Sequence, residues 1–246
     1  MKERLSMLKR ILLFLLLLLL AACSKEPSII IQEITDSAGE TSIDIVEEGF
    51  SDEEQFQFLE FTLSDQQIRL NIDKIPILDN YLENHIDKNQ AIQEMQLIQI
   101  LKDKFDSIFL LSFACQDSAC SYVLINTETE YSQLLADQAQ IIKINPSPDE
   151  SYLLIQFERQ LLNKNWLTNK LVIFELEKWE EVILTEDDNN MTSLHSFRWP
   201  ILNIEWISDN ELEITLPDID FPSTTTLEAW CESEDKPEKT IIAQAN

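Results

Sequence analysis

"IIKINPSPDESYLLIQF", residues 141–157, contains the pattern that decides the fold. A short apolar run enters a turn built from Pro, Ser and Asp, and a second apolar run follows directly. Ser and Asp side chains hydrogen-bond to the backbone of their own turn, and Pro fixes the backbone angle there. Two apolar runs joined by such a turn are typical of an antiparallel β-hairpin.

The same layout, a strand, a turn centred on Asp and a second strand, occurs in three other segments. They are "LEFTLSDQQIRLNI" (59–72), "LIQILKDKFDSIFLLSF" (97–113) and "NIEWISDNELEITL" (203–216). Acidic hairpins follow two of the copies, at 122–135 ("YVLINTETEYSQLL") and 171–184 ("LVIFELEKWEEVIL"). The units that begin at 97 and 141 are 44 residues apart, a spacing typical of propeller blades. We therefore expect an all-β, mainly antiparallel fold.

Residues 97–216 resemble the blades of TolB-like and dipeptidyl-peptidase-like β-propellers, in which a Ser-Pro-Asp turn precedes a strand. Ser147, Pro148 and Asp149 match that turn, but Glu150 stands where those blades usually have glycine. The resemblance implies a small or incomplete propeller-like repeat of hairpins, because a closed ring takes four or more blades. A generic antiparallel meander is the alternative, since any series of alternating hairpins can imitate a blade.

One segment departs from the strand pattern. Apolar and aromatic residues recur at helical spacing after Pro76, which predicts a short helix near 77–87. The predicted organisation is a signal peptide at 1–22, a tether with weak strands at 23–55, a β-rich repeat domain at 56–230 and a charged C-terminal tail at 231–246.

The N-terminus has the layout of an export signal: four basic residues, an apolar run at 11–20, then small residues. That run is too short for a permanent membrane helix, which needs about 20 residues. Leu20-Ala21-Ala22-Cys23 resembles the lipobox of bacterial lipoproteins, which implies cleavage before Cys23 and acylation of that residue. The implied location is the cell membrane, and the outer membrane facing the periplasm in a Gram-negative host. An ordinary signal peptide with an incidental cysteine is the alternative.

Composition excludes several functions. The chain has 45 acidic and 18 basic residues, a net charge of −27, so it repels nucleic acid and favours cationic partners. The charge can also serve solubility alone. Gly39 and Gly49 are the two glycines in the whole sequence. P-loops, dinucleotide-binding turns and nucleophile elbows all require glycine, so these three kinds of site are excluded.

Three cysteines follow Cys23. Cys115 and Cys120 flank "QDSA" between two predicted strands, where a hairpin would place them opposite each other. Facing positions on paired strands are close enough for a disulfide. The oxidising compartment to which the chain is exported favours such a bond. We expect this bond, with Cys231 free or paired between molecules. A zinc site is the weaker alternative, because it needs four ligands.

Few other residues are candidates for catalysis or metal binding. His85 and His195 belong to no motif, and we interpret both as structural or surface groups. The carboxylates of "TEDDNN" (185–190) and "PDID" (217–220) could hold calcium, but they lack the spacing of an EF-hand loop. We therefore expect no catalytic residue, no metal site and no cofactor.

Trp179, in an acidic hairpin turn, and Trp199, at the end of a long connection, are candidate partner contacts, with core packing as the alternative. The sequence predicts a membrane-anchored lipoprotein whose acidic β-rich domain binds an envelope protein without catalysis. The alternatives are an envelope hydrolase that uses paired carboxylates and a small-ligand or calcium-binding module.

Overall fold

A computed structural model describes residues 43–49, 55–63, 66–101, 105–161, 164–186 and 189–246. All of them belong to one unit of the chain, Ile31–Asn246. The signal peptide, the lipobox and Cys23 lie outside the described residues. Antiparallel strands dominate the described part, as the alternating apolar pattern predicts. No helix in these segments is both long and apolar enough to cross a membrane.

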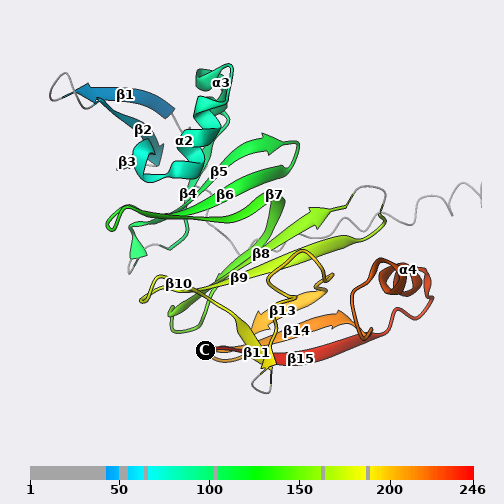
Figure 1. Cartoon of the computed structure of the whole chain (residues 1–246). Coiled ribbons are helices and arrows are strands. Elements are labelled where there is room, and N and C mark those ends of the chain that lie inside the picture. The colour runs from blue at the N-terminus through cyan, green and yellow to red at the C-terminus, as the bar shows by residue number, and fades with distance from the viewer. Residues whose placement is uncertain (1–42, 50–54, 64–65, 102–104, 162–163, 187–188) are drawn as a thin grey trace, which may run out of the picture. The chain divides into compact units, whose positions relative to one another are not determined.

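The strands form three sheets (Figure 1). The first sheet has the order β1-β2-β3 and contains β1 (Ile43–Gly49), β2 (Gln55–Leu63) and β3 (Gln66–Asn71). Its second hairpin, β2–β3, is the one predicted at 59–72. The strand expected at the end of the tether is β1, which pairs with β2 along its whole length.

The second sheet has seven strands in the order β10-β9-β8-β7-β6-β5-β4. They are β4 (Gln96–Gln99), β5 (Ile108–Gln116), β6 (Ala119–Asn126), β7 (Tyr131–Pro146), β8 (Tyr152–Gln160), β9 (Leu167–Glu175) and β10 (Glu180–Val182). The four hairpins predicted between residues 97 and 184 are all present as antiparallel pairs of neighbouring strands.

The long strand β7 joins the two predicted repeat units. Its first part, 131–139, pairs with β6, and its second part, 140–146, pairs with β8. Between them Gln138 has a φ of 45°, and the register shifts on both sides. Arg159 of β8 supports this bend, because its guanidinium donates hydrogen bonds to the carbonyl oxygens of Asp137 and Gln138.

The third sheet has the order β12-β11-β15-β14-β13. Its strands are β11 (Leu184–Glu186), β12 (Asn189–Asn190), β13 (Asn203–Trp206), β14 (Glu211–Pro217) and β15 (Glu238–Ala245). The hairpin predicted at 203–216 is β13–β14. The tail predicted at 231–246 is wrong in its second half: β15 lies between β11 and β14, because the alternating Ala243 and Ala245 are buried there.

The predicted helix near 77–87 is α2 (Pro76–Glu83), which begins at Pro76 after the 3-10 turn η2 (Ile72–Lys74). It ends four residues earlier than expected, because Asn84 caps the helix and Ile86 is fully exposed. Two further helices, α3 (Lys88–Gln93) and α4 (Thr224–Glu232), were not predicted. Their start signals are Asp87 and Ser223, whose side chains accept hydrogen bonds from backbone N–H groups of the first turn.

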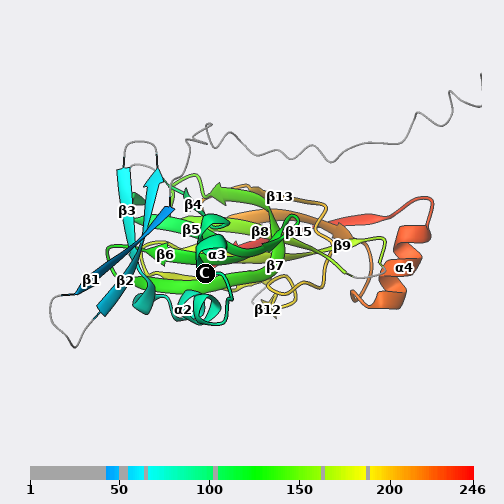
Figure 2. The same cartoon turned by 90° about the horizontal axis from the view of Figure 1, so that it is seen from above.

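Period-2 alternation sorts the apolar residues of the seven-stranded sheet onto its two faces. In β5, Phe109 and Leu111 face the first sheet and helices α2 and α3, whereas Ile108 and Leu110 face a second core. In β8 and β9 the other face packs on the third sheet, through Leu154 among others. Both faces are therefore covered, which explains the continuous apolar runs. Figure 2 shows α2 and α3 over the sheet.

Candidate functional site

The predicted disulfide is present in the β5–β6 hairpin. Cys115 and Cys120 are bonded with a Cα–Cα distance of 4.0 Å. Gln116 pairs with Ala119, so Asp117 and one neighbour form the turn, and Asp117 has a φ of 55°. Cys231 is free and half-buried in α4, and burial raises the pKa of its thiol.

Trp199 is not a surface contact. Its side chain is only 7% exposed and packs in the core between β8, β9 and the third sheet. The indole Nε1 donates to Ser193 Oγ at 3.1 Å, and the backbone bridges to Asn169 of β9. The core-packing alternative therefore holds for Trp199, because the connection before β13 folds back over the sheet.

Trp179 is half-buried rather than exposed on the surface. It occupies the turn between β9 and β10 with a φ of 57°, and its ring makes edge contacts with Phe174 and Tyr131. The two ring centroids of Trp179 and Tyr131 are 5.8 Å apart. Trp179 therefore supports Tyr131 of β7, which is itself 45% exposed.

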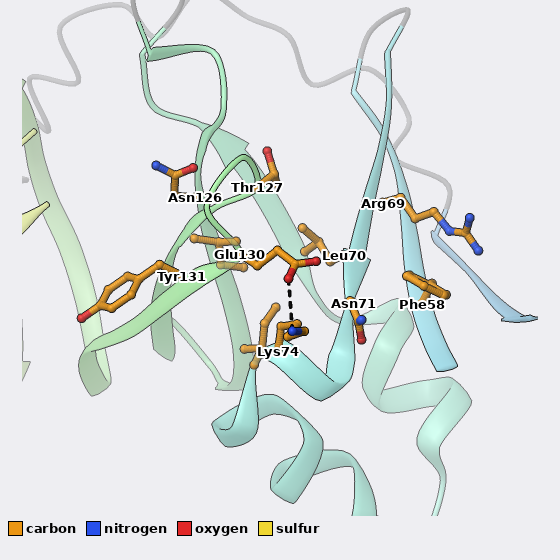
Figure 3. A pocket seen from close by; sticks show the side chains of 11 residues that line it. Phe58, Arg69, Leu70, Asn71, Lys74, Asn126, Thr127, Glu130 and Tyr131 are labelled. Atoms are coloured by element: carbon orange, nitrogen blue, oxygen red, sulfur yellow. Dashed lines mark ion pairs between the residues drawn. The ribbon is translucent and has the colours of Figure 1, made fainter. Parts of the chain in front are cut away.

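Tyr131 is part of the wall of a pocket of about 120 Å³ (Figure 3). One side of the pocket comes from β2, β3 and the 3-10 turn η2, and the other from the end of β6 and the β6–β7 turn. No sequence motif marks this site, because its two sides lie at least fifty residues apart in the chain. Its lining residues are Phe58, Arg69, Leu70, Asn71, Lys74, Ile75, Ile125, Asn126, Thr127, Glu130 and Tyr131.

The floor of the pocket is apolar and buried. Leu70, Ile75 and Ile125 are almost completely buried and belong to the core shared by the first sheet, α2 and α3, and β5 and β6. Alternation along β3 and β6 directs Leu70 and Ile125 inward, and Ile75 lies between η2 and α2. Because the same residues hold the elements together, the pocket shape is set by the core itself.

An ion pair links the two sides. Lys74 Nζ lies 3.2 Å from Glu130 Oε2, and both side chains are about half exposed (Figure 3). Ser132 Oγ donates to the carbonyl oxygen of Lys74 at 3.1 Å, which adds a second tie between η2 and β7. Surface pairs of this kind contribute little stability, about 0–1 kcal/mol, so a ligand could displace either partner at small cost.

A second cation on the rim is also neutralised. The Arg69 guanidinium lies 3.9 Å from the centroid of the Phe58 ring, and its Nε is 3.6 Å from Glu60 Oε1. Stacking on an aromatic face and pairing with a carboxylate both stabilise a guanidinium. The guanidinium therefore already has an aromatic and a carboxylate partner.

Two asparagines complete the rim, and their orientation is fixed by the backbone. Asn71 Oδ1 accepts from the backbone N–H of Asp73, and Asn126 Oδ1 accepts from the N–H groups of Glu128 and Thr129. Because these oxygens are already occupied, each amide is left with its NH₂ group as the end available to other partners.

The histidines are structural. His195 is buried, and its Nε2 accepts from the N–H of Leu184 at 3.1 Å, while its Nδ1 lies 3.8 Å from Glu181 Oε1. His85 is exposed and its ring lies 4.9 Å from that of Tyr81. Neither lines the pocket. In the described segments no three His, Cys, Asp or Glu residues gather as a metal site would require.

No family model and no curated protein matches the chain. Among solved structures, a crystal structure of the tricorn protease matches with a TM-score of 0.33 and 10% sequence identity. The match covers 72% of this chain, which spans about 15% of the length of the tricorn chain.

Proposed function

We propose that this chain is an exported bacterial lipoprotein, held at the membrane by acyl chains on Cys23, whose acidic β-rich domain binds another envelope protein without catalysis. In a Gram-negative host its place is the outer membrane, facing the periplasm. The lipobox supports the anchor, and the bonded pair Cys115–Cys120 supports export, because such bonds persist in oxidising compartments.

The pocket beside β3 is the observation that carries the binding function. It combines a preformed apolar floor with a polar, ion-paired rim, which is the usual composition of a recognition site. It also lies at the border of two sheets and beside the exposed Tyr131, an aromatic of the type that anchors protein interfaces. These features suit a site that holds a partner's side chain.

We also propose that the repeats are related to propeller blades. Strands β4 to β7 and strands β7 to β10 form two successive antiparallel four-stranded units that share β7. A unit repeated along the chain with matching hairpins is how blades are built. On this proposal the chain carries a blade-like repeat on which a binding site has been added at one edge.

Cell fractionation and crosslinking test the proposed function. We expect the chain to appear in the membrane fraction with acyl chains on Cys23, and a Cys23→Ser variant to lose both. Crosslinking in cells followed by affinity capture should recover one envelope protein in comparable amount. An unacylated, soluble chain contradicts the anchor, and capture of no protein above the level of a mock strain contradicts partner binding.

A further inference from the structure

From the surroundings of His195 we infer a pH-sensitive switch at the point where the chain passes from the second sheet to the third. The neutral imidazole holds the start of β11, and the protonated imidazole releases β11 and pairs with Glu181 of β10. This switch is independent of the proposed function, because it concerns the coupling of two sheets and not the binding of a partner.

His195 lies beside the link between the two sheets. Val182 is the last residue of β10 in the second sheet and Leu184 is the first residue of β11 in the third, so a single residue separates the two strands (Figure 1). The imidazole, whose side chain is 6% exposed, faces both of them. Its Nε2 accepts from the N–H of Leu184 at 3.1 Å, and its Nδ1 lies 3.8 Å from Glu181 Oε1. A change in the ring therefore acts on both sheets.

The connection that carries His195 supplies a partner to each backbone group of Leu184. The carbonyl oxygen of Leu184 accepts from the N–H of Met191 at 2.8 Å, and the N–H of Leu184 donates to the imidazole. Leu184 is 0% exposed, so water does not replace a lost partner. A buried N–H without an acceptor is costly. The start of β11 therefore depends on the state of His195.

The backbone donor at Leu184 fixes the tautomer of the neutral ring. A backbone N–H only donates, so Nε2 is the acceptor and the proton of neutral His195 is on Nδ1. Nδ1 has no hydrogen-bond partner among the described residues, and its distance of 3.8 Å from Glu181 Oε1 is too long for a hydrogen bond. The neutral ring therefore bonds to β11 and not to Glu181.

Protonation reverses this preference. The added proton binds Nε2, where it faces the N–H of Leu184, and two donors cannot form a hydrogen bond. The positive ring is instead attracted to the carboxylate of Glu181, whose Oε2 already accepts from Gln133 Nε2 of β7 at 3.1 Å. Histidine is the side chain that ordinarily changes its charge between about pH 5 and 8. Mild acid therefore moves the hydrogen bonding of His195 from β11 to β10.

The charge nearest to the ring is negative. In the described part of the chain Glu181 is the carboxylate within ion-pair range of the imidazole. Two cations on neighbouring strands are bonded elsewhere: Lys170 donates to the carbonyl of Leu135, and Lys239 donates to the carbonyl of Ile219. The charged residues on the surrounding elements are Lys170 and Glu175 of β9, Glu180 and Glu181 of β10, Glu186 of β11, Glu238 and Lys239 of β15, and Arg198 of the connection that carries His195.

Hydrogen exchange at the Leu184 amide tests the switch on the full chain in phosphatidylcholine nanodiscs. Exchange is measured by mass spectrometry with fragmentation to single residues at about pH 7.5 and about pH 5.5, on either side of the range in which histidine ordinarily titrates. Rates are corrected for the pH dependence of intrinsic exchange. We expect the protection of Leu184 to fall at least tenfold in acid, while amides in the centre of β8, such as that of Leu154, keep theirs.

Variants assign the effect to His195. In His195→Gln a side-chain amide oxygen accepts from the Leu184 N–H at both pH values, so protection should change less than twofold. His85→Gln replaces the other histidine of the chain, which is exposed, and should keep the tenfold fall of the wild type. Glu181→Gln removes the charge that attracts the protonated ring and should move the midpoint of the fall to lower pH. Glu180→Gln, at the exposed neighbouring position, should leave the midpoint unchanged.

Three results overturn the inference. They are unchanged protection of Leu184 in acid, an equal fall in the wild type and in His195→Gln, and an equal fall at Leu184 and in β8, which reports global unfolding. If His195→Gln does not fold, the nitrogen chemical shifts of His195 in the wild type decide. A proton on Nδ1 at neutral pH, with Nε2 gaining one as the Leu184 amide loses protection, supports the switch. A neutral ring that carries its proton on Nε2 overturns it.

Discussion

Glu150 shows how a single residue can satisfy a turn for which it is poorly suited. Its φ of 58° lies in the left-handed region, where a side chain beyond Cβ costs energy and glycine is free of that cost. The turn forms all the same, because Glu150 N donates to the carbonyl of Ser147 and Tyr152 N donates to Ser147 Oγ. The turn therefore forms without glycine at this position.

We predict that Glu150→Gly increases the free energy of unfolding by about 1 kcal/mol, because glycine adopts this φ without the steric cost of a Cβ. Urea denaturation measures the change. Glu128→Gly is the matched control in another acidic turn: Glu128 is not among the residues with positive φ, so glycine there should lower stability. A loss of stability in Glu150→Gly would contradict the account of this turn.

The same turn contains a carboxylate that links stability to pH. Ser151 and Ser147 donate hydrogen bonds to Asp149 and lower the pKa of its carboxyl group to about 2, below the ordinary value of 3.8. Because the folded-state pKa is the lower one, the contribution of Asp149 is complete above about pH 4. It is lost as the pH falls from about 4 to about 2.

We therefore predict that Asp149→Ala lowers the melting temperature at pH 7, and that its difference from the wild type shrinks as the pH falls toward 2. Thermal melts across this range measure the effect. Asp235→Ala, at an exposed residue whose carboxylate accepts no hydrogen bond from the described residues, is the control and should show no such trend. A difference for Asp149→Ala that is independent of pH would contradict the linkage.

At the scale of elements, a disulfide holds the β5–β6 hairpin, and sheet contacts hold the C-terminal segment that the sequence suggests is a charged tail. The β5–β6 hairpin is closed by a bond between residues five apart in sequence. The C-terminal strand β15 contacts both β11 and β14, although its sequence begins with charged residues. Each of these two elements is held by a few contacts. Removing such a contact should lower the free energy of unfolding by an amount that can be estimated.

We predict that the double variant Cys115→Ser and Cys120→Ser loses about 2 kcal/mol of unfolding free energy, the amount expected for so short a closed loop. Denaturation of oxidised wild type and variant measures it, with mass spectrometry after non-reducing alkylation as the check on pairing. Cys231→Ser, at the free thiol, is the control and should differ little from the wild type. Alkylation of Cys115 and Cys120 without reduction would show that the bond does not form.

Adjacent residues of β15 test its place in the sheet. Ala243 is 0% exposed and Ile242 is 41% exposed, because neighbouring side chains point to opposite faces. Ala243→Asp buries a charge without a partner and should cost more than about 3 kcal/mol, or prevent folding. Ile242→Asp should cost less than about 1 kcal/mol. Similar costs at the two positions, measured by denaturation and soluble yield, would contradict a β15 packed inside the sheet.

At the scale of the whole molecule, the sequence predicts local pairing well and long-range placement poorly. Every hairpin quoted from the sequence is present, because alternation and turn chemistry are local signals. The sharing of β7 between two units depends on a bend at Gln138 that Arg159 stabilises from another strand. The pocket lies between β3 and the β6–β7 turn, and no local sequence pattern indicates that these two segments are neighbours.

The same contrast between local and long-range contacts applies to individual site residues. Cys115 and Cys120 are close in sequence and their bond was predictable. For Trp199 the sequence allows a partner contact or core packing, and tertiary contacts with the third sheet bury it in the core. The sequence allows the same two alternatives for Trp179, and the structure shows it half-buried with its ring against Tyr131 and Phe174. For both tryptophans, contacts with elements distant in the sequence set how far the side chain is buried.

The most direct test of the central claim places a photo-crosslinking amino acid at position 131 of the full chain in its own host. Position 234, an exposed residue in the loop after α4, carries the same group in a control strain. The account predicts one envelope protein crosslinked from position 131 and absent from position 234. Identical crosslinks from both positions, or none from position 131, would contradict a partner site at this pocket.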